Sequence, residues 1–285
     1  MGTHTLAAGQ YTTVINGLTI HYTIRTSGVG LPPLVIHPPP WGCGVSLYEG
    51  SFTHLESKYT LIYPQPRGND ASQRPDDPTE MSSRHICDDL DVFRQQLGLE
   101  KINLLGHSSG GTIAAGYAIA YPDKVDKVIL VNTDLPGYTR KDRSFFEDMA
   151  NIRTSQNLSV ETDDEFKAYI VKCLPLYFAH PEKGYAEAFE KAWQSKVSLW
   201  AYQNYYGADK SDAGKWDMLS ELGKVTAKAL VIVGKADRCC ALEVSEAAAG
   251  GIKGSQLVAL DECGHFPWVG AADEFWSVLE KFLSN

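Results

Sequence analysis

The strongest chemical signal in the sequence is a serine between glycines, in the segment Gly106-His107-Ser108-Ser109-Gly110. The short apolar stretch 102–105 leads into this segment, and mostly small residues follow it over 112–120. A serine at such a junction of strand and helix is typical of a nucleophile elbow, in which a strained turn lifts the hydroxyl clear of the sheet. Glycines remove side chains where strand and helix would collide, and the helix N-terminus directs N–H groups at a developing oxyanion. The pattern predicts that Ser108 is a nucleophile.

A serine hydroxyl attacks efficiently only when a base removes its proton. In sites built on a nucleophile elbow, the base comes late in the chain, after the last strand. His265 has this position, because it follows the apolar stretch 257–260 and precedes the helical stretch 274–282. His107, inside the elbow itself, is expected to pack or to hydrogen-bond locally.

An acid that orients the histidine should come before it, at the end of the preceding strand. Asp237 follows the apolar stretch 229–233 by a few residues, and it is the favoured acid. Asp134 follows the stretch 127–131 and is the alternative. The order Ser108, Asp237, His265 is that of the hydrolases with an elbow and differs from the orders of chymotrypsin and subtilisin.

The elements that must position these residues alternate between short apolar runs and helical stretches. A hairpin is predicted over 11–25, around the Asn16-Gly17 turn. Alternation of this kind predicts an α/β fold with a mostly parallel central sheet and helices on both faces. Ligands in such folds bind beyond the carboxyl ends of the strands. The further strands are expected at 34–36, 60–63, 102–105, 127–131, 229–233 and 256–260, and helices at 88–97, 112–120 and 274–282.

Residues 138–216 break the alternation, because they contain no clear strand and many aromatic side chains. This segment is predicted to be a helical cap inserted into a core formed by 1–137 and 217–285. An insertion at the carboxyl ends of the strands would cover Ser108, and part of its aromatic side chains would line a pocket.

Composition excludes several classes of partner. The chain has 35 carboxylates against 26 Lys and Arg, a net charge of −9, and no dense basic cluster, so nucleic acid is not expected to bind. No secretion signal or membrane-spanning run is visible, which predicts a cytoplasmic protein. The expected partner is a small-molecule substrate, and the expected state is a monomer or a homodimer. The six cysteines form no CxxC pair and are expected to be reduced, and no metal or organic cofactor is expected.

The chain resembles an α/β-hydrolase from end to end, and it is most similar to the proline iminopeptidase group. This resemblance implies a Ser-His-Asp enzyme with a cap. The elbow is the specific feature, and the others support it through their order along the chain. The matching stretches are His37-Pro-Pro-Pro-Trp-Gly42, Gln65-Pro-Arg67-Gly68-Asn-Asp-Ala-Ser72, Gly106–Gly110, Gly234–Asp237 and Gly264-His265.

Three departures from that group concern the site. The group has a His-Gly-Gly-Pro-Gly loop whose second glycine donates an oxyanion N–H, and Pro39 stands at the corresponding position without an N–H. Ser109 is expected to keep one donor, with Trp41 or Gly42 supplying the second. The group's Asp-Gln-Arg-Gly-x-Gly turn has lost its acid and its second glycine here. Its cap Trp-Glu pair, which holds the substrate's amine, corresponds to Trp200-Ala201 without the acid.

These features predict a serine hydrolase that cleaves an ester or a lactone in a small, largely apolar molecule through an acyl-enzyme. Pro39, His107, Trp200 and Phe266 are expected to line the substrate site. Four alternatives remain open: a proline iminopeptidase or amidase, a hydrolase of carbon–carbon bonds, a thioesterase, and a member of the fold that binds a small ligand without hydrolysing it.

Overall fold

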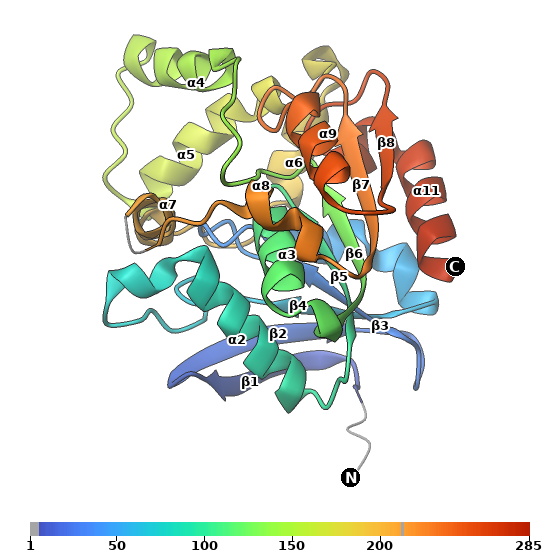
Figure 1. The fold of residues 1–285 in the computed structure, drawn as a ribbon. Helices are drawn as coiled ribbons and strands as arrows, with labels where there is room; N and C mark the ends of the chain where they lie inside the picture. Colours follow the sequence, from blue (N-terminus) through green and yellow to red (C-terminus); the bar gives the residue numbers. More distant parts are fainter. Residues whose placement is uncertain (1–5, 212–213) are drawn as a thin grey trace.

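Eight strands form a single sheet in the computed structural model, which describes residues 6–211 and 214–285 (Figure 1). The sheet order is β1-β2-β4-β3-β5-β6-β7-β8. The first two strands form the predicted hairpin, and β2 also pairs antiparallel with β4, whereas the pairs from β4 through β8 are parallel. The predicted α/β class and mostly parallel sheet are therefore confirmed. The strands are β1 (Gly9–Ile15), β2 (Leu18–Arg25), β3 (Pro33–His37), β4 (Thr60–Pro64), β5 (Ile102–His107), β6 (Val125–Val131), β7 (Lys228–Gly234) and β8 (Gln256–Leu260).

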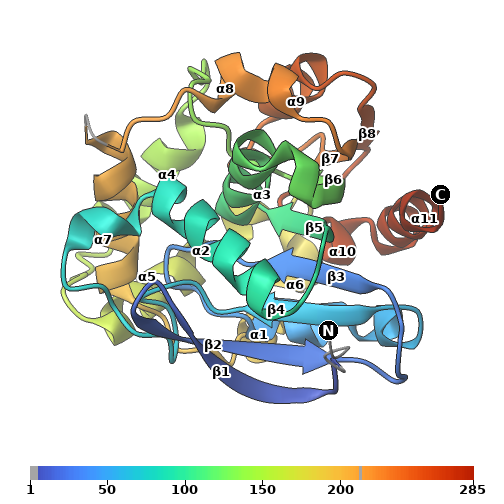
Figure 2. The same ribbon diagram turned by 60° about the horizontal axis from the view of Figure 1, so that its bottom comes forward.

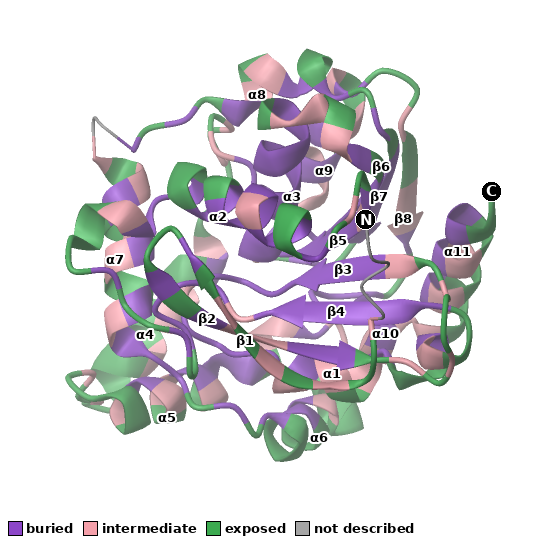
Figure 3. Cartoon of the chain, turned by 90° about the horizontal axis from the view of Figure 1, so that it is seen from below, coloured by how far each residue is buried: buried purple, intermediate pink, exposed green. Residues whose placement is uncertain are grey.

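Alternating side chains of the central strands feed two separate apolar cores, one on each face of the sheet. In β6, Val128 and Leu130 belong to one core, whereas Ile129 and Val131 belong to the other. The first core packs under α2 (Ser83–Gln96), α3 (Ser109–Ala120) and α9 (Leu242–Gly251), and the second under α1 (Ser46–Ser51) and α11 (Ala272–Ser284) (Figure 2). Because both faces are covered, the middle strands are buried along almost their whole length (Figure 3).

The predicted element positions hold closely for the strands and less closely for the helices. From β3 to β8, the observed strand ends differ from the predicted ones by no more than two residues. Helix α2 begins at Ser83, well before the predicted start at residue 88, because Ser82 caps it and accepts a hydrogen bond from the N–H of His85. Helix α3 begins at Ser109, directly after the elbow serine.

Four helices of eight residues or more, together with the short α8 (Met218–Glu221), occupy the long connection between β6 and β7, and its described residues contain no strand. The four longer helices are α4 (Ser144–Ser155), α5 (Asp163–Cys173), α6 (Tyr185–Ala192) and α7 (Leu199–Lys210). In Figure 1, α4, α5 and α7 lie to one side of the sheet, away from α11. The short elements are α8 (Met218–Glu221), α10 (Pro267–Gly270) and the 3-10 turns η1 (Thr53–Ser57), η2 (Pro78–Met81), η3 (Pro122–Lys124), η4 (Leu174–Tyr177), η5 (Pro181–Lys183) and η6 (Leu222–Lys224). Within the described ranges, no helix combines the length and apolarity that crossing a bilayer requires.

Candidate active site

Ser108 occupies the sharp turn between β5 and α3. Its backbone has φ 56° and ψ −127°, a conformation that costs a residue with a side chain on the order of 1–3 kcal/mol. The turn is held from the neighbouring strand, because the N–H of Ser108 donates to the carbonyl of Val131 at 3.0 Å. The strained turn that the glycine-flanked motif predicts is therefore present.

The glycines in and beside the elbow lie so close to neighbouring segments that no side chain would fit at their positions. A Cβ on Gly106 would overlap the carbonyl of Gly110, and a Cβ on Gly110 would overlap the carbonyl of His37. Gly111 packs in the same way against the side chain of Thr133. The strand, the elbow and the loop after β3 thus approach one another at backbone distance.

We expect Gly106→Ala to lower the free energy of unfolding by at least about 2 kcal/mol, because the new methyl group meets backbone that cannot rotate away. The matched control is Gly250→Ala in α9, where a Cβ meets no atom within 4 Å. Alanine is the better helix former, so this control should stabilise the protein by about 0.5–1 kcal/mol. Urea unfolding of both variants makes the comparison, and equal effects at the two positions would contradict the packing described for the elbow.

His265 and Asp237 form a buried pair beside the elbow. The Nδ1 atom of His265 lies 2.7 Å from Oδ2 of Asp237, and the two residues are 2% and 4% exposed. The other carboxylate oxygen of Asp237 accepts the N–H groups of Cys239 and Cys240, at 2.8 Å and 3.0 Å. Asp134, the alternative acid, instead forms a salt bridge with Arg140 at 2.6 Å. The acid that contacts the histidine is thus Asp237.

Asn132 is a further partner of this pair, which the sequence reasoning did not identify. It follows β6 with a left-handed φ of 45°, and its side-chain N–H donates to Oδ2 of Asp237 at 2.6 Å. Its position directly after a parallel strand is a sequence signal for such a partner, because the carboxyl ends of the strands face the site and asparagine tolerates the left-handed backbone region. Its donor holds the carboxylate that in turn orients the imidazole.

The pair shifts the pKa of each partner toward the charged form. Burial alone would lower the pKa of His265, but the charge of Asp237 and the hydrogen bond to it outweigh burial and raise that pKa above its usual value. Burial would raise the pKa of Asp237, but His265 and the hydrogen bonds from Asn132 and the Cys240 N–H hold it below its usual value. Asp237 is therefore ionised, and an imidazolium formed at His265 is stabilised.

The loop that carries His265 is fixed from two sides. The N–H of His265 donates to the carbonyl of Tyr177 at 2.7 Å, and its own carbonyl lies 2.8 Å from Nε2 of His107. The other nitrogen of His107 lies 2.9 Å from the hydroxyl of Tyr48. Burial, followed by the proximity of His265, keeps the pKa of His107 well below its usual value, so this ring is neutral and donates through Nε2. The hydrogen-bond partners of His107 thus come from segments distant in the chain, and its ring also packs against Phe266 and Trp268.

A cavity of about 910 Å³ contains the predicted nucleophile and base. Ser108, Ser109 and His265 line it together with side chains from the connection between β6 and β7. The predicted substrate-site residues Pro39, His107 and Phe266 line it as well. Rings and aliphatic side chains form most of its wall, namely Trp41, Leu47, Tyr48, Leu135, Tyr138, Phe145, Phe146, Met149, Ile170, Leu174, Tyr177, Phe189, Trp193, Tyr202 and Tyr206.

Trp200, also predicted to line the substrate site, lies elsewhere. Its ring lies under the guanidinium of Arg74 at 4.9 Å and fills the space beside Gly68. The residues of α7 that line the cavity recur at helical spacing along another side of the helix, namely Tyr202, Gln203, Tyr206, Gly207 and Lys210. The prediction for Trp200 was wrong because a position two residues away on a helix points in a different direction.

Comparison with known proteins assigns the chain to a protein family. A model of the family described as the alpha/beta hydrolase fold matches residues 32–269. The chain belongs to this family. It is 25% identical to a proline iminopeptidase from Saccharolobus solfataricus, with 95% of this chain and 91% of the relative covered. It is also 25% identical to a 2-hydroxymuconate semialdehyde hydrolase from Pseudomonas putida, with 100% and 95% covered. Among solved structures, the enol-lactonase from Burkholderia xenovorans LB400 superposes with a TM-score of 0.75 at 20% identity, over 96% of this chain and all of that chain.

The loop after β3 distinguishes this α/β-hydrolase from the iminopeptidase pattern. Gly42, one of the two predicted second oxyanion donors, is engaged elsewhere, because its N–H donates to Oδ1 of Asn69 at 2.5 Å. Among the described residues, the N–H of Trp41 makes no hydrogen bond, and Trp41 lines the cavity with Ser108. The N–H of Ser109 lies in the first turn of α3, where N–H groups lack intrahelical acceptors. Of the predicted oxyanion donors Ser109, Trp41 and Gly42, Gly42 is thus the one whose N–H is engaged by another side chain.

Proposed function

We propose that this α/β-hydrolase is a serine hydrolase that cleaves an ester or a lactone in a small, largely apolar molecule. The observation that carries the proposal is the coexistence, in one mostly apolar cavity, of the strained Ser108 elbow and His265 paired with a buried carboxylate. Residues 138–216 act in this proposal as a cap whose aromatic side chains hold the apolar part of the substrate.

The reaction follows from the roles of these groups. Ser108 Oγ attacks the carbonyl carbon while His265 Nε2 accepts its proton, and Asp237 stabilises the imidazolium. The N–H groups of Ser109 and Trp41 receive the negative charge that develops on the carbonyl oxygen. His265 then gives the proton to the leaving alcohol, and the same base activates the water that hydrolyses the acyl-enzyme. In a lactone the alcohol belongs to the same molecule as the acyl group, so ring opening gives a hydroxyacyl-enzyme and its hydrolysis releases a single hydroxy acid.

The charges around the cavity disfavour a substrate with a free amine. Among the described residues that line it, Asp134 is the single carboxylate, and it is already paired with Arg140. Arg143 and Lys210 add two more cationic side chains to the lining. An ammonium group inside this cavity would lose water and gain no free counter-charge, which is costly. Neutral or anionic substrates are therefore favoured over the amines that an iminopeptidase binds.

Cleavage of a carbon–carbon bond in an acidic diketone is the second candidate. The P. putida relative is named for a muconate semialdehyde, and a relative from Comamonas testosteroni is named for a phenylhexadienoate, both carboxylates. The cationic side chains of the cavity suit such an anion. The same nucleophile and base would serve either reaction.

A substrate panel tests the proposal. We expect kcat/KM for p-nitrophenyl butyrate or a γ-lactone to exceed that for prolyl p-nitroanilide by at least about 100-fold, a difference of roughly 3 kcal/mol. Each rate is compared with that of the Ser108→Ala protein, which removes background hydrolysis. A phenylhexadienoate diketone as the best substrate would establish the second candidate, and prolyl p-nitroanilide as the best substrate would contradict both.

A further inference from the structure

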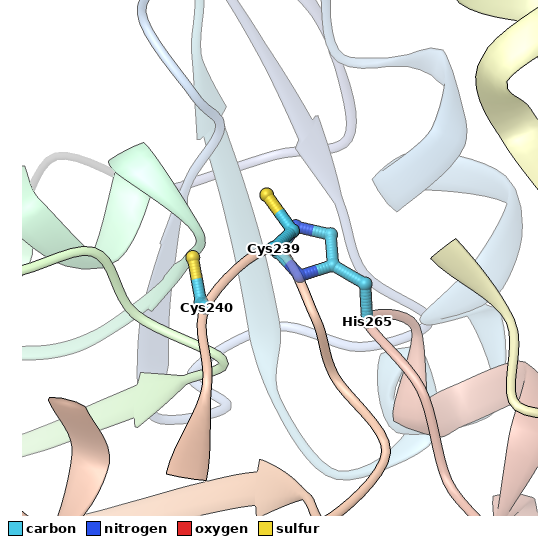
Figure 4. A group of neighbouring side chains, drawn as sticks. All are labelled: Cys239, Cys240 and His265. Atoms are coloured by element: carbon cyan, nitrogen blue, oxygen red, sulfur yellow. The ribbon is translucent and has the colours of Figure 1, made fainter. Parts of the chain in front are cut away.

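Two adjacent cysteines lie beside the proposed base, and the mechanism above uses neither thiol. Cys239 and Cys240 follow Asp237 in the loop after β7, and both side chains line the cavity that contains Ser108. Their sulfur atoms and a ring nitrogen of His265 all lie within 4.8 Å of one another. Figure 4 shows the His265 ring reaching toward Cys239, with both sulfur atoms directed to the same side.

The loop holds these ligand atoms in place through Asp237. The N–H groups of Cys239 and Cys240 both donate to Oδ1 of this carboxylate, while Nδ1 of His265 contacts Oδ2. One carboxylate thus fixes the backbone of both cysteines and the orientation of the imidazole. Because Nδ1 is engaged, Nε2 is the nitrogen left to bind a further group, and it is also the nitrogen that must accept the Ser108 proton.

The donor set is that of a borderline-soft metal ion. Two thiolates and one imidazole are the ligands that zinc takes in sites with an open fourth position. Zinc ligands lie roughly 3.5–3.8 Å from one another, as follows from tetrahedral bonds of about 2.0–2.3 Å. The present ligand atoms, all within 4.8 Å of one another, are thus at most about 1 Å too far apart for that size. Rotation about the Cα–Cβ bond of each cysteine is the movement that can bring its sulfur atom closer. Cys239 is partly exposed, so an ion can enter from the cavity.

We propose that Cys239, Cys240 and His265 form a binding site for Zn²⁺ or another borderline-soft divalent ion, and that an ion in this site inhibits the hydrolase. Binding releases one proton from each thiol to solvent, and the two thiolates and the neutral imidazole bind the ion without any change of oxidation state. The ion takes the lone pair of His265, which then cannot accept the Ser108 proton. The inhibition, but not the binding, rests on the proposed function.

Direct binding of Zn²⁺ tests the site without relying on catalysis. The wild-type protein and Ser108→Ala should each bind one Zn²⁺ per chain with equal affinity, measured by competition with a chromophoric chelator, since Ser108 supplies no ligand. The double variant Cys239→Ala/Cys240→Ala keeps both N–H groups on Asp237 but should bind at least about 100-fold more weakly, because one ligand of three remains. Cys43→Ala is the matched control: Cys43 also lines the cavity but lies outside the group, so this variant should bind like wild type.

Inhibition is measured on the same proteins with p-nitrophenyl butyrate. Micromolar Zn²⁺ should abolish turnover by the wild type and by Cys43→Ala, a chelator should restore it, and the double variant should retain its own turnover in the presence of Zn²⁺. Absence of stoichiometric binding, or equal binding by the double variant, would overturn the proposed site. An inert wild type that still binds one Zn²⁺ would refute the proposed function while leaving the site intact.

Discussion

Ser108→Ala should lower kcat for ester hydrolysis by about 10⁴–10⁶-fold, the range found when the nucleophile of a serine triad is removed. The loss should lie in kcat and not in KM, because the cavity wall that binds the substrate is unchanged. Folding should be unaffected, since the hydroxyl is used for chemistry while the backbone of the turn is held by the N–H of Ser108.

Ser109→Ala is the matched control for this variant. It removes a neighbouring hydroxyl, which lies 3.0 Å from the hydroxyl of Tyr206, but it keeps the N–H that is assigned to the oxyanion. We expect its kcat to stay within about tenfold of wild type, the cost of one hydrogen bond. Equal losses in the two variants would contradict the assignment of Ser108 as the nucleophile.

Asp237→Asn should lower kcat by about 10⁴-fold, because the amide favours the wrong imidazole tautomer and no longer stabilises the imidazolium. The pH profile should change as well. Asp237 raises the pKa of His265, and the base works only when neutral, so wild-type kcat/KM should fall as pH decreases through this raised pKa. Removing the carboxylate charge lowers the pKa, so the acid limb of the residual activity should move to lower pH.

The alternative acid provides the control. Asp134→Asn loses the salt bridge to Arg140 but leaves the contact between Asp237 and His265 untouched. Its kcat should remain within about tenfold of wild type, and its acid limb should keep the wild-type position. Profiles of kcat/KM against pH for the two variants decide which aspartate acts with His265. A larger loss of kcat in Asp134→Asn than in Asp237→Asn would assign this role to Asp134.

The sequence predicts the fold and the candidate site residues Ser108, Asp237 and His265 because the constraints on both are local. The elbow needs small residues at fixed offsets from Ser108, and the chain order limits where the acid and base can stand. The central strands are recognisable because they are buried on both faces and carry continuous apolar runs.

What the sequence does not predict depends on contacts between distant segments. The hydrogen bond from Asn132 to Asp237 and the one from His107 to His265 join residues 105 and 158 positions apart. The engagement of the Gly42 N–H depends on Asn69, which belongs to another loop. No periodicity or motif within one segment specifies such pairs, so these hydrogen bonds become visible only in the structure.

The most direct test of the central claim is labelling with a fluorophosphonate probe, which modifies only an activated serine. Wild type and His265→Ala are incubated with the probe, and the modified peptide is identified by mass spectrometry. We expect one adduct per chain on Ser108 in the wild type and labelling at least about 100-fold slower in His265→Ala, since the base contributes about 10²–10⁴-fold. A folded wild type that stays unlabelled, or equally fast labelling of both proteins, would contradict activation of Ser108 by His265.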